Sequence, residues 1–246
     1  MDPVLKQLFD AETHLFNQAL SPDAAAEDGL RYLLPLYQRK SKFKKDIATA
    51  VSEMTGYGYL QSGKPLKAAQ CFEEARNYYQ TGLCYLVAKD LDSTHRTWSH
   101  VIEAHPFHWC ITVWGTIHHQ LESYPSFFQI RNHLEASIGQ FFRYKRGDLA
   151  NCLIDYADTM AQINLETYKY IGRALLNFEK DIPRAEHYLL KNQKILPNDP
   201  EVYYHLAQAK HLMGQDEDAL ILLAQCTTIN YAYTPATDLK NRILKN

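Results

Sequence analysis

The densest group of potential metal ligands in this 246-residue chain is a set of histidines with one cysteine near its centre. His105, His108 and Cys110 fall within six residues, and His118 and His119 follow shortly after. Imidazole nitrogens and thiolate sulfurs are ligands that Zn²⁺ prefers. However, the sequence contains neither a CxxC pair nor an HExxH pattern, and a proline inside the group indicates a turn. We therefore favour packing or surface histidines and keep a zinc site as the alternative.

Motifs for phosphate binding or nucleophilic catalysis do not appear elsewhere in the sequence. The closest approach to a phosphate loop is Gly56-Tyr57-Gly58, which lies in a helix-forming stretch rather than after a strand. Carboxylates such as Glu73 and Glu74 are typical of a solvated helix face. The sequence therefore predicts a protein that is not an enzyme and has no cofactor. An enzyme or a metal-binding helical protein is the alternative.

A basic cluster occupies residues 39–45, with five cations in seven residues. Such a cluster attracts an acidic segment or a phosphate group. The whole chain, however, has a formal net charge of -2 and no wider basic footprint of the kind that nucleic-acid-binding proteins carry. We interpret the cluster as a solvated connection between helices, with an acidic partner as the alternative, and expect no nucleic-acid partner.

The composition, 46% hydrophobic and 22% charged, is that of an ordinary globular protein. The longest nearly apolar run, 109–117, is much shorter than the roughly 20 residues of a spanning helix. The first residues lack the basic and apolar regions of a secretory signal. The five cysteines form no CxxC pair and are expected to be reduced thiols. We therefore predict a cytoplasmic protein without a membrane span.

Apolar residues return at intervals of three and four along most of the chain, which is the spacing of helices that bury one face. The pattern TGxxYL begins at Thr55 and again at Thr81. Toward the C-terminus, Tyr168 and Tyr203 occupy equivalent places 35 residues apart. These internal repeats predict a series of helical hairpins.

The repeated pattern resembles the tetratricopeptide repeat (TPR) family, in which a small residue and an aromatic residue on helix A meet an alanine and a large apolar residue on helix B. Gly56, Gly82, Gly172 and Ala207 match the small position. The resemblance implies an all-α, right-handed superhelical solenoid of antiparallel helix hairpins that forms one domain over 1–246. The expected parts are an N-terminal cap (1–48), four repeats (49–74, 75–108, 165–199 and 200–233), degenerate repeats (109–164) and a C-terminal capping helix (234–246).

The small residues on helix A have a packing explanation. A glycine inside a helix costs about 0.5–1 kcal/mol relative to alanine. Burying an aromatic or large aliphatic side chain contributes about 1.5–3 kcal/mol, so a close helix crossing more than offsets that cost. We predict close crossings at Gly56, Gly82, Gly172 and Ala207. Gly58 has no equivalent in the other units.

In TPR proteins helix A lines a concave groove, so the resemblance implies a peptide or protein ligand in that groove. Aromatic and hydrogen-bonding side chains there would suit a binding hot spot, although some of the tyrosines could instead pack between repeats. The residues expected on the groove are Tyr57, Tyr79, Gln80, Leu83, Lys169, Tyr170, Arg173, Tyr204, His205 and Gln208.

The carboxylate clamp of TPR co-chaperones provides a more specific comparison. Lys169 and Arg173 match two of its basic positions, whereas Tyr57, Leu83 and Gln208 stand where its asparagines would be. This difference argues against a chaperone-tail clamp. The resemblance therefore implies a non-catalytic adaptor or scaffold, and it does not specify an oligomeric state. A secretion-type chaperone that holds an extended client is the alternative.

Overall fold

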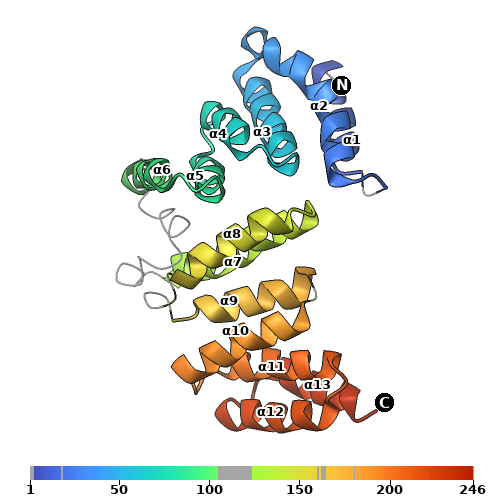
Figure 1. The fold of residues 1–246 in the computed structure, drawn as a ribbon, viewed down its shortest axis with the longest axis vertical. Helices are drawn as coiled ribbons and strands as arrows, with labels where there is room; N and C mark the ends of the chain where they lie inside the picture. Colours follow the sequence, from blue (N-terminus) through green and yellow to red (C-terminus); the bar gives the residue numbers. More distant parts are fainter. Residues whose placement is uncertain are drawn as a thin grey trace. The chain divides into compact units, whose positions relative to one another are not determined.

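The computed structural model describes residues 3–17, 19–104, 124–159, 161, 165–179 and 181–245, and every regular element in these ranges is helical (Figure 1). The predicted all-α fold is therefore confirmed. The helices are α1 (Pro3–Leu15), α2 (Pro22–Gln38), α3 (Lys45–Gln61), α4 (Pro65–Glu74), α5 (Tyr78–Val87), α6 (Leu91–Ala104), α7 (Tyr124–Arg143), α8 (Gly147–Thr159), α9 (Thr167–Ala174), α10 (Ile182–Ile195), α11 (Pro200–Leu212), α12 (Asp216–Ile229) and α13 (Thr234–Ile243), with a 3-10 turn η1 (Lys40–Lys42) and a π-helical turn η3 (Leu175–Glu179).

The described helices fall into two compact units. Unit 1 contains α1 to α6 and the first half of α8, and unit 2 contains α7, the end of α8 and α9 to α13. A single right-handed solenoid over the whole chain stays a prediction. The group of histidines and Cys110 at 105–119 lies outside the described residues.

Unit 1 is built from helices that pack in sequence. α1 contacts α2, α3 contacts α4 and α5 contacts α6, and the next helix in each case packs on the preceding pair. The N-terminal core joins Leu8 and Ala11 of α1 to Leu33 and Leu36 of α2 and to Val51 of α3. Each helix therefore buries its apolar stripe against its neighbours in the chain, as the three- and four-residue spacing predicts.

Unit 2 repeats this arrangement. α9 packs on α10, α10 on α11 and α11 on α12, while α13 covers α11 and α12. The core at its C-terminal end joins Ala207, Ala219, Leu223, Cys226 and Ile243. The same arrangement of a small residue on helix A against apolar residues on helix B recurs here.

Four turns between consecutive helices share one backbone conformation. Gly63 and Gly214 take positive φ angles of 70° and 73°, and Lys89 and Lys145 take 63° and 53° at the α5–α6 and α7–α8 turns. A left-handed residue at this position ends a helix and favours glycine. The two lysines therefore adopt a conformation that glycine adopts at lower cost.

The predicted close crossings are confirmed for three glycines. A Cβ atom on Gly56 would lie 2.9 Å from the ring of Phe72, and one on Gly172 would lie 2.6 Å from Leu189 Cγ. At Gly82 it would lie only 2.0 Å from Trp98 Nε1. Each glycine thus lets a large side chain of helix B rest directly on the backbone of helix A.

Gly58, which the repeat pattern does not explain, makes a second close contact on α3. A Cβ atom there would lie 2.9 Å from Leu30 Cδ2, on α2. Gly56 therefore allows close packing against α4, and Gly58 allows close packing against α2. α3 is packed closely on both sides.

Buried charge network and candidate binding surface

The expected groove residues of unit 1 are mostly packed. Leu83 is 0% exposed and Gln80 is buried, which contradicts their expected place on an open surface. The reason is that α5 is enclosed by α4 and α6. Tyr57 and Tyr79 are half-buried, and their rings contact helix B aromatics, Phe72 at 5.0 Å and Trp98 at 6.4 Å between ring centroids. Both tyrosines therefore pack partly within their repeats, as the alternative interpretation of the sequence expects.

In unit 2, Lys169 and Tyr170 are also interior residues, each only 1% exposed. Their expected position on an exposed groove wall is wrong. They lie on the first turns of α9, a helix that packs on α7, α10 and α11. Buried charges are tolerated only when they are paired and hydrogen-bonded.

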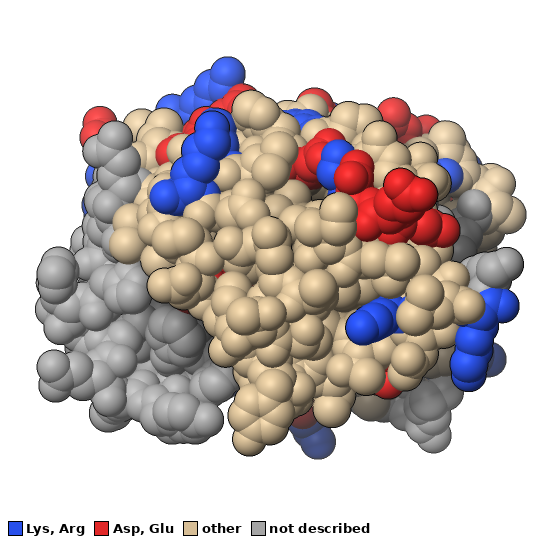
Figure 2. All heavy atoms as spheres, turned by 90° about the horizontal axis from the view of Figure 1, so that it is seen from below, with Lys and Arg blue, Asp and Glu red and all other residues tan. Residues whose placement is uncertain are grey.

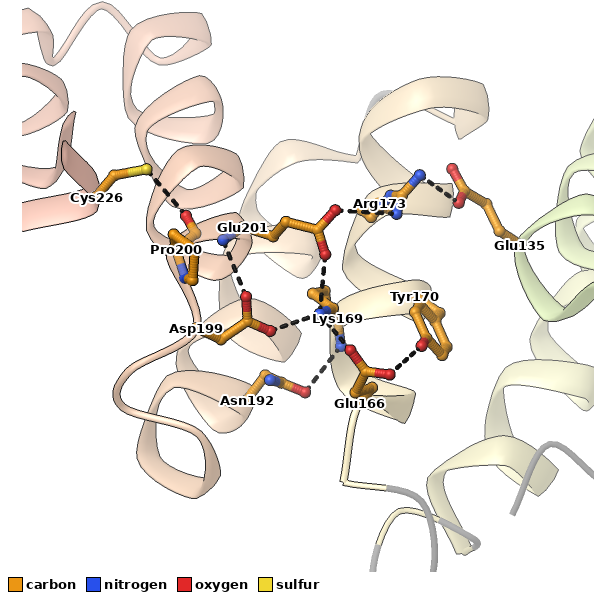
Figure 3. Close-up of polar contacts among 10 residues, drawn as sticks. All are labelled: Glu135, Glu166, Lys169, Tyr170, Arg173, Asn192, Asp199, Pro200, Glu201 and Cys226. Carbon is orange, nitrogen blue, oxygen red and sulfur yellow. Dashed lines mark hydrogen bonds and ion pairs between the residues drawn. The ribbon is translucent and has the colours of Figure 1, made fainter. Parts of the chain in front are cut away.

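Lys169 is paired with three carboxylates (Figure 3). Its Nζ atom lies 2.6 Å from Glu166 Oε1, 2.5 Å from Asp199 Oδ2 and 3.0 Å from Glu201 Oε2. The backbone N–H of the same residue donates to Asn192 Oδ1 at 3.1 Å. One side chain of α9 is thereby tied to the beginning of α11, and its backbone to α10.

Arg173, one turn further along α9, extends the network. Its guanidinium lies 3.0 Å from Glu135 Oε2 on α7 and 3.9 Å from Glu201 Oε1 on α11. Glu135 also accepts a hydrogen bond from Asn177 Nδ2 at 2.9 Å. The side chain of Arg173 remains about one-fifth exposed, so it retains a face toward solvent. The network as a whole contains two more carboxylates than cations (Figure 3).

The three carboxylates around Lys169 have the composition of a cation site. Oxygen atoms of Glu166, Asp199 and Glu201 lie within 4.8 Å of one another, and no other such group occurs among the described residues. The Lys169 ammonium, however, is within hydrogen-bond distance of all three carboxylates. Tyr170 also donates its hydroxyl to Glu166 at 2.5 Å. The protein therefore already places its own cation at the centre of this group, and we interpret the arrangement as a structural network.

The expected groove residues of α11 remain partly exposed and are joined to one another. Gln208 Nε2 donates to the Tyr204 hydroxyl at 3.1 Å, and Gln208 Oε1 lies 2.7 Å from His205 Nδ1. The Tyr204 ring also meets Tyr233 edge-on at 5.5 Å between centroids, and burial raises the pKa of its hydroxyl. We call Tyr204, His205 and Gln208 the α11 strip. It presents an aromatic ring, an imidazole and an amide in fixed positions.

The C-terminal helices also expose apolar side chains. Leu212, Ile221 and Leu244 are each about 60% exposed, and Tyr231 is 91% exposed. Figure 2 views the chain from the side on which α12 and α13 lie in Figure 1, and the centre of this face carries few charged side chains. Exposed apolar patches mark interaction surfaces more often than scattered single residues do.

The described helices and their small-residue crossings define an all-helical protein with a TPR-like fold. No family model matches the chain, and no curated protein matches it. Its fold is similar to that of YrrB, described as a TPR protein with an unusual peptide-binding site, at 14% identity over 83% of this chain and 96% of that chain, with a TM-score of 0.38. The structure of MamA from AMB-1 is similar at 15% identity over 76% and 94% of the two chains, with a TM-score of 0.36.

Sequence reasoning missed the acidic partners of the buried network. Glu166 and Lys169 are separated by three residues, a spacing that signals a helical ion pair. Asp199 and Glu201 lie at the start of a helix, where acidic residues are common and carry no specific signal.

The described helices include none that is long and apolar enough to cross a membrane.

Proposed function

We propose that this chain is a non-catalytic module that binds a peptide or protein segment, and that the α11 strip is part of its binding surface. The single observation that carries the proposal is the strip itself. Tyr204, His205 and Gln208 are partly exposed and hydrogen-bonded to one another on one helix. Aromatic residues with fixed polar neighbours are typical of interface hot spots.

The buried network supports this role because it holds α11 in place. Asp199 accepts the backbone N–H of Glu201 through Oδ1 and contacts Lys169 through Oδ2. The N-terminus of α11 is therefore capped and joined to α9 by the same side chain. A surface whose side chains are already ordered loses less conformational entropy on binding. Arg173, partly exposed at the edge of the network, adds a cation to the proposed surface.

In unit 1, taken by itself, we propose that Tyr57 and Tyr79 contact a ligand. Both are half-buried, so each ring packs on one side and keeps some area for a ligand on the other. Gln80 and Leu83 of unit 1, and Lys169 and Tyr170 of unit 2, are interior residues and are not proposed to contact a ligand.

A cytoplasmic location is part of the proposal. Cys71, Cys84, Cys152 and Cys226 are free, and burial raises the pKa of the Cys84 thiol far above its usual range. Free buried thiols are usual in a reducing compartment.

A secretion-type chaperone is the second candidate, and the exposed apolar side chains at the C-terminal end favour it. Leu212, Ile221 and Leu244 would suit an apolar client segment. Such a chaperone would form an obligate complex with its client on co-expression, whereas an adaptor is stable alone. Purification of the chain with and without candidate clients separates the two functions.

The proposal is tested by partner capture with a double variant, His205→Ala with Gln208→Ala. Both side chains are partly exposed, so the free energy of unfolding should change by no more than about 0.5 kcal/mol per site. Gln225→Ala, on the exposed face of α12, is the matched control. We expect the double variant to lose partners that the wild type and the control retain. Equal capture by all three proteins would place the binding surface elsewhere.

A further inference from the structure

A hollow of about 330 Å³ lies in unit 1, where η1, the first half of α3 and the turn between α4 and α5 meet. Its lining includes two lysines and an arginine from three different parts of the chain, together with three hydroxyl side chains. These residues are Lys40, Lys45 and Arg76, and Ser41, Thr49 and Ser52. We call it the Lys45–Arg76 hollow. Lys40, Ser41 and Lys45 of the lining belong to the basic cluster at 39–45, which has no role in the proposed protein-binding surface.

Two of the three cations are available to a ligand. Lys45 and Arg76 are exposed and form no ion pair with a described residue. Lys40 is engaged, because its Nζ atom lies 3.0 Å from Glu74 Oε2. Glu74 is the one carboxylate of the lining, and Lys40 together with the Tyr37 hydroxyl, at 2.6 Å, partly offsets its negative charge. The charge left in the hollow is therefore positive.

Ser52 provides a second, independent indication of a ligand. Its side chain is 2% exposed and lines the hollow, yet its hydroxyl has no hydrogen-bond partner among the described residues. A serine or threonine inside a helix usually donates to a carbonyl in the preceding turn. Thr55 on the same helix does so, with its Oγ1 2.7 Å from Val51 O. The Ser52 side chain is thus almost entirely buried, has no hydrogen-bond partner among the described residues and shares the lining of the hollow with Lys45 and Arg76.

The start of α3 adds to the positive character of the hollow. The N-cap residue Lys44 makes no side-chain cap hydrogen bond, so the first N–H groups of this 17-residue helix are not satisfied by that side chain. Free N–H groups at a helix N-terminus, together with the helix dipole, favour an anion.

We propose that the Lys45–Arg76 hollow binds a phosphomonoester group. A phosphate dianion presents several strong acceptor oxygens, which suit two free cations together with the hydroxyls of Ser52 and Thr49. A polyanion such as nucleic acid or an anionic bilayer requires a wider basic surface, and the chain as a whole carries a formal net charge of -2. This site goes beyond the protein-binding function, and neither depends on the other.

The experiment measures binding by calorimetry at fixed ionic strength, because surface charge effects are screened by salt. The probes are inorganic phosphate, a peptide with one phosphoserine, and the same peptide with glutamate in that place. Saturable binding of inorganic phosphate alone indicates a free ion as the source, and tighter binding of the phosphopeptide indicates a protein segment.

The variants are Ser52→Ala and the pair Lys45→Ala with Arg76→Gly. Glycine is chosen because residue 76 has a φ of 60°. Loss of charge-assisted hydrogen bonds should weaken phosphate binding roughly tenfold or more in the double variant. Lys42→Ala, an exposed lysine outside the lining, is the matched control and should bind as the wild type does. Circular dichroism should show unchanged helix content in every variant.

Three results would overturn the proposal. The first is the absence of saturable binding of either phosphate probe by the wild type. The second is an equal loss of phosphate binding in Lys42→Ala and in the pair Lys45→Ala with Arg76→Gly, since general charge attraction would then suffice. The third is binding of the glutamate peptide as tight as that of the phosphopeptide, which would indicate a site for any anion.

Discussion

Lys169 Nζ lies 2.5 Å from Asp199 Oδ2, although the two residues are 30 positions apart in the chain. Through its other oxygen, Asp199 also caps α11, the helix that carries Tyr204, His205 and Gln208. A buried lysine on α9 therefore fixes the start of the helix that carries the proposed binding strip.

The first prediction concerns this lysine. Lys169→Met should lower the free energy of unfolding by about 3–5 kcal/mol, because it leaves three carboxylates close together without their cation. Urea unfolding followed by circular dichroism provides the measurement. Lys191→Met is the control, since the Lys191–Asp158 pair at 3.6 Å is about one-third exposed and should contribute no more than about 1 kcal/mol. Similar losses in both variants would contradict a structural role for the network.

The second prediction concerns the closest helix crossing. Gly82→Ala should lower stability by about 1–3 kcal/mol, because the new methyl group would lie 2.0 Å from Trp98 Nε1 and force the indole to move. That indole donates to Tyr79 O at 3.3 Å, so the hydrogen bond should weaken as well. Gly147→Ala has open space around its Cβ and is the control. A melting temperature that Gly82→Ala leaves unchanged would show that α5 and α6 are not packed as described.

The third prediction uses the left-handed turns. Lys89 has a φ of 63° between α5 and α6, where the equivalent turns of two other hairpins have glycine. Lys89→Gly should therefore raise the free energy of unfolding by about 0.5–1 kcal/mol. Lys89→Ala removes the same side chain but keeps the unfavourable φ, so it should not stabilise. If Lys89→Gly and Lys89→Ala have the same melting temperature, the added stability does not come from relief of the positive φ angle.

The fourth prediction concerns alkaline pH. Burial, with a smaller effect of neighbouring Asp199, raises the pKa of the Cys226 thiol from its ordinary value of 9.0 to about 11. The folded chain then holds this proton more tightly than the unfolded chain, so the stability it contributes is complete below pH 9 and is lost as the pH rises toward 11. Melting temperatures from pH 7 to 11 under reducing conditions should fall less for Cys226→Ala than for the wild type. Parallel curves would mean that this thiol has no raised pKa.

Sequence reasoning succeeded where a residue type has one dominant physical explanation. Gly56, Gly82 and Gly172 stand at helix crossings because a large side chain of the next helix needs the space. It failed at Lys169, because a lysine on a predicted helix is normally solvated, and the carboxylates that bury it come from a segment 30 residues away. It also failed at Leu83, because the helical period alone does not reveal that α5 is covered on two sides.

The measurement that tests the central claim most directly is photo-crosslinking from the α11 strip. A photoreactive phenylalanine analogue at position 208, on α11, is compared with the same analogue at position 225, on the exposed face of α12. Both positions hold glutamine in the wild type, so the substitutions are matched.

In native extract, we expect discrete crosslinked products from position 208 that an excess of unlabelled wild-type chain abolishes, and none from position 225. Identical products from both positions, or products from position 225 alone, would contradict a binding surface on the α11 strip.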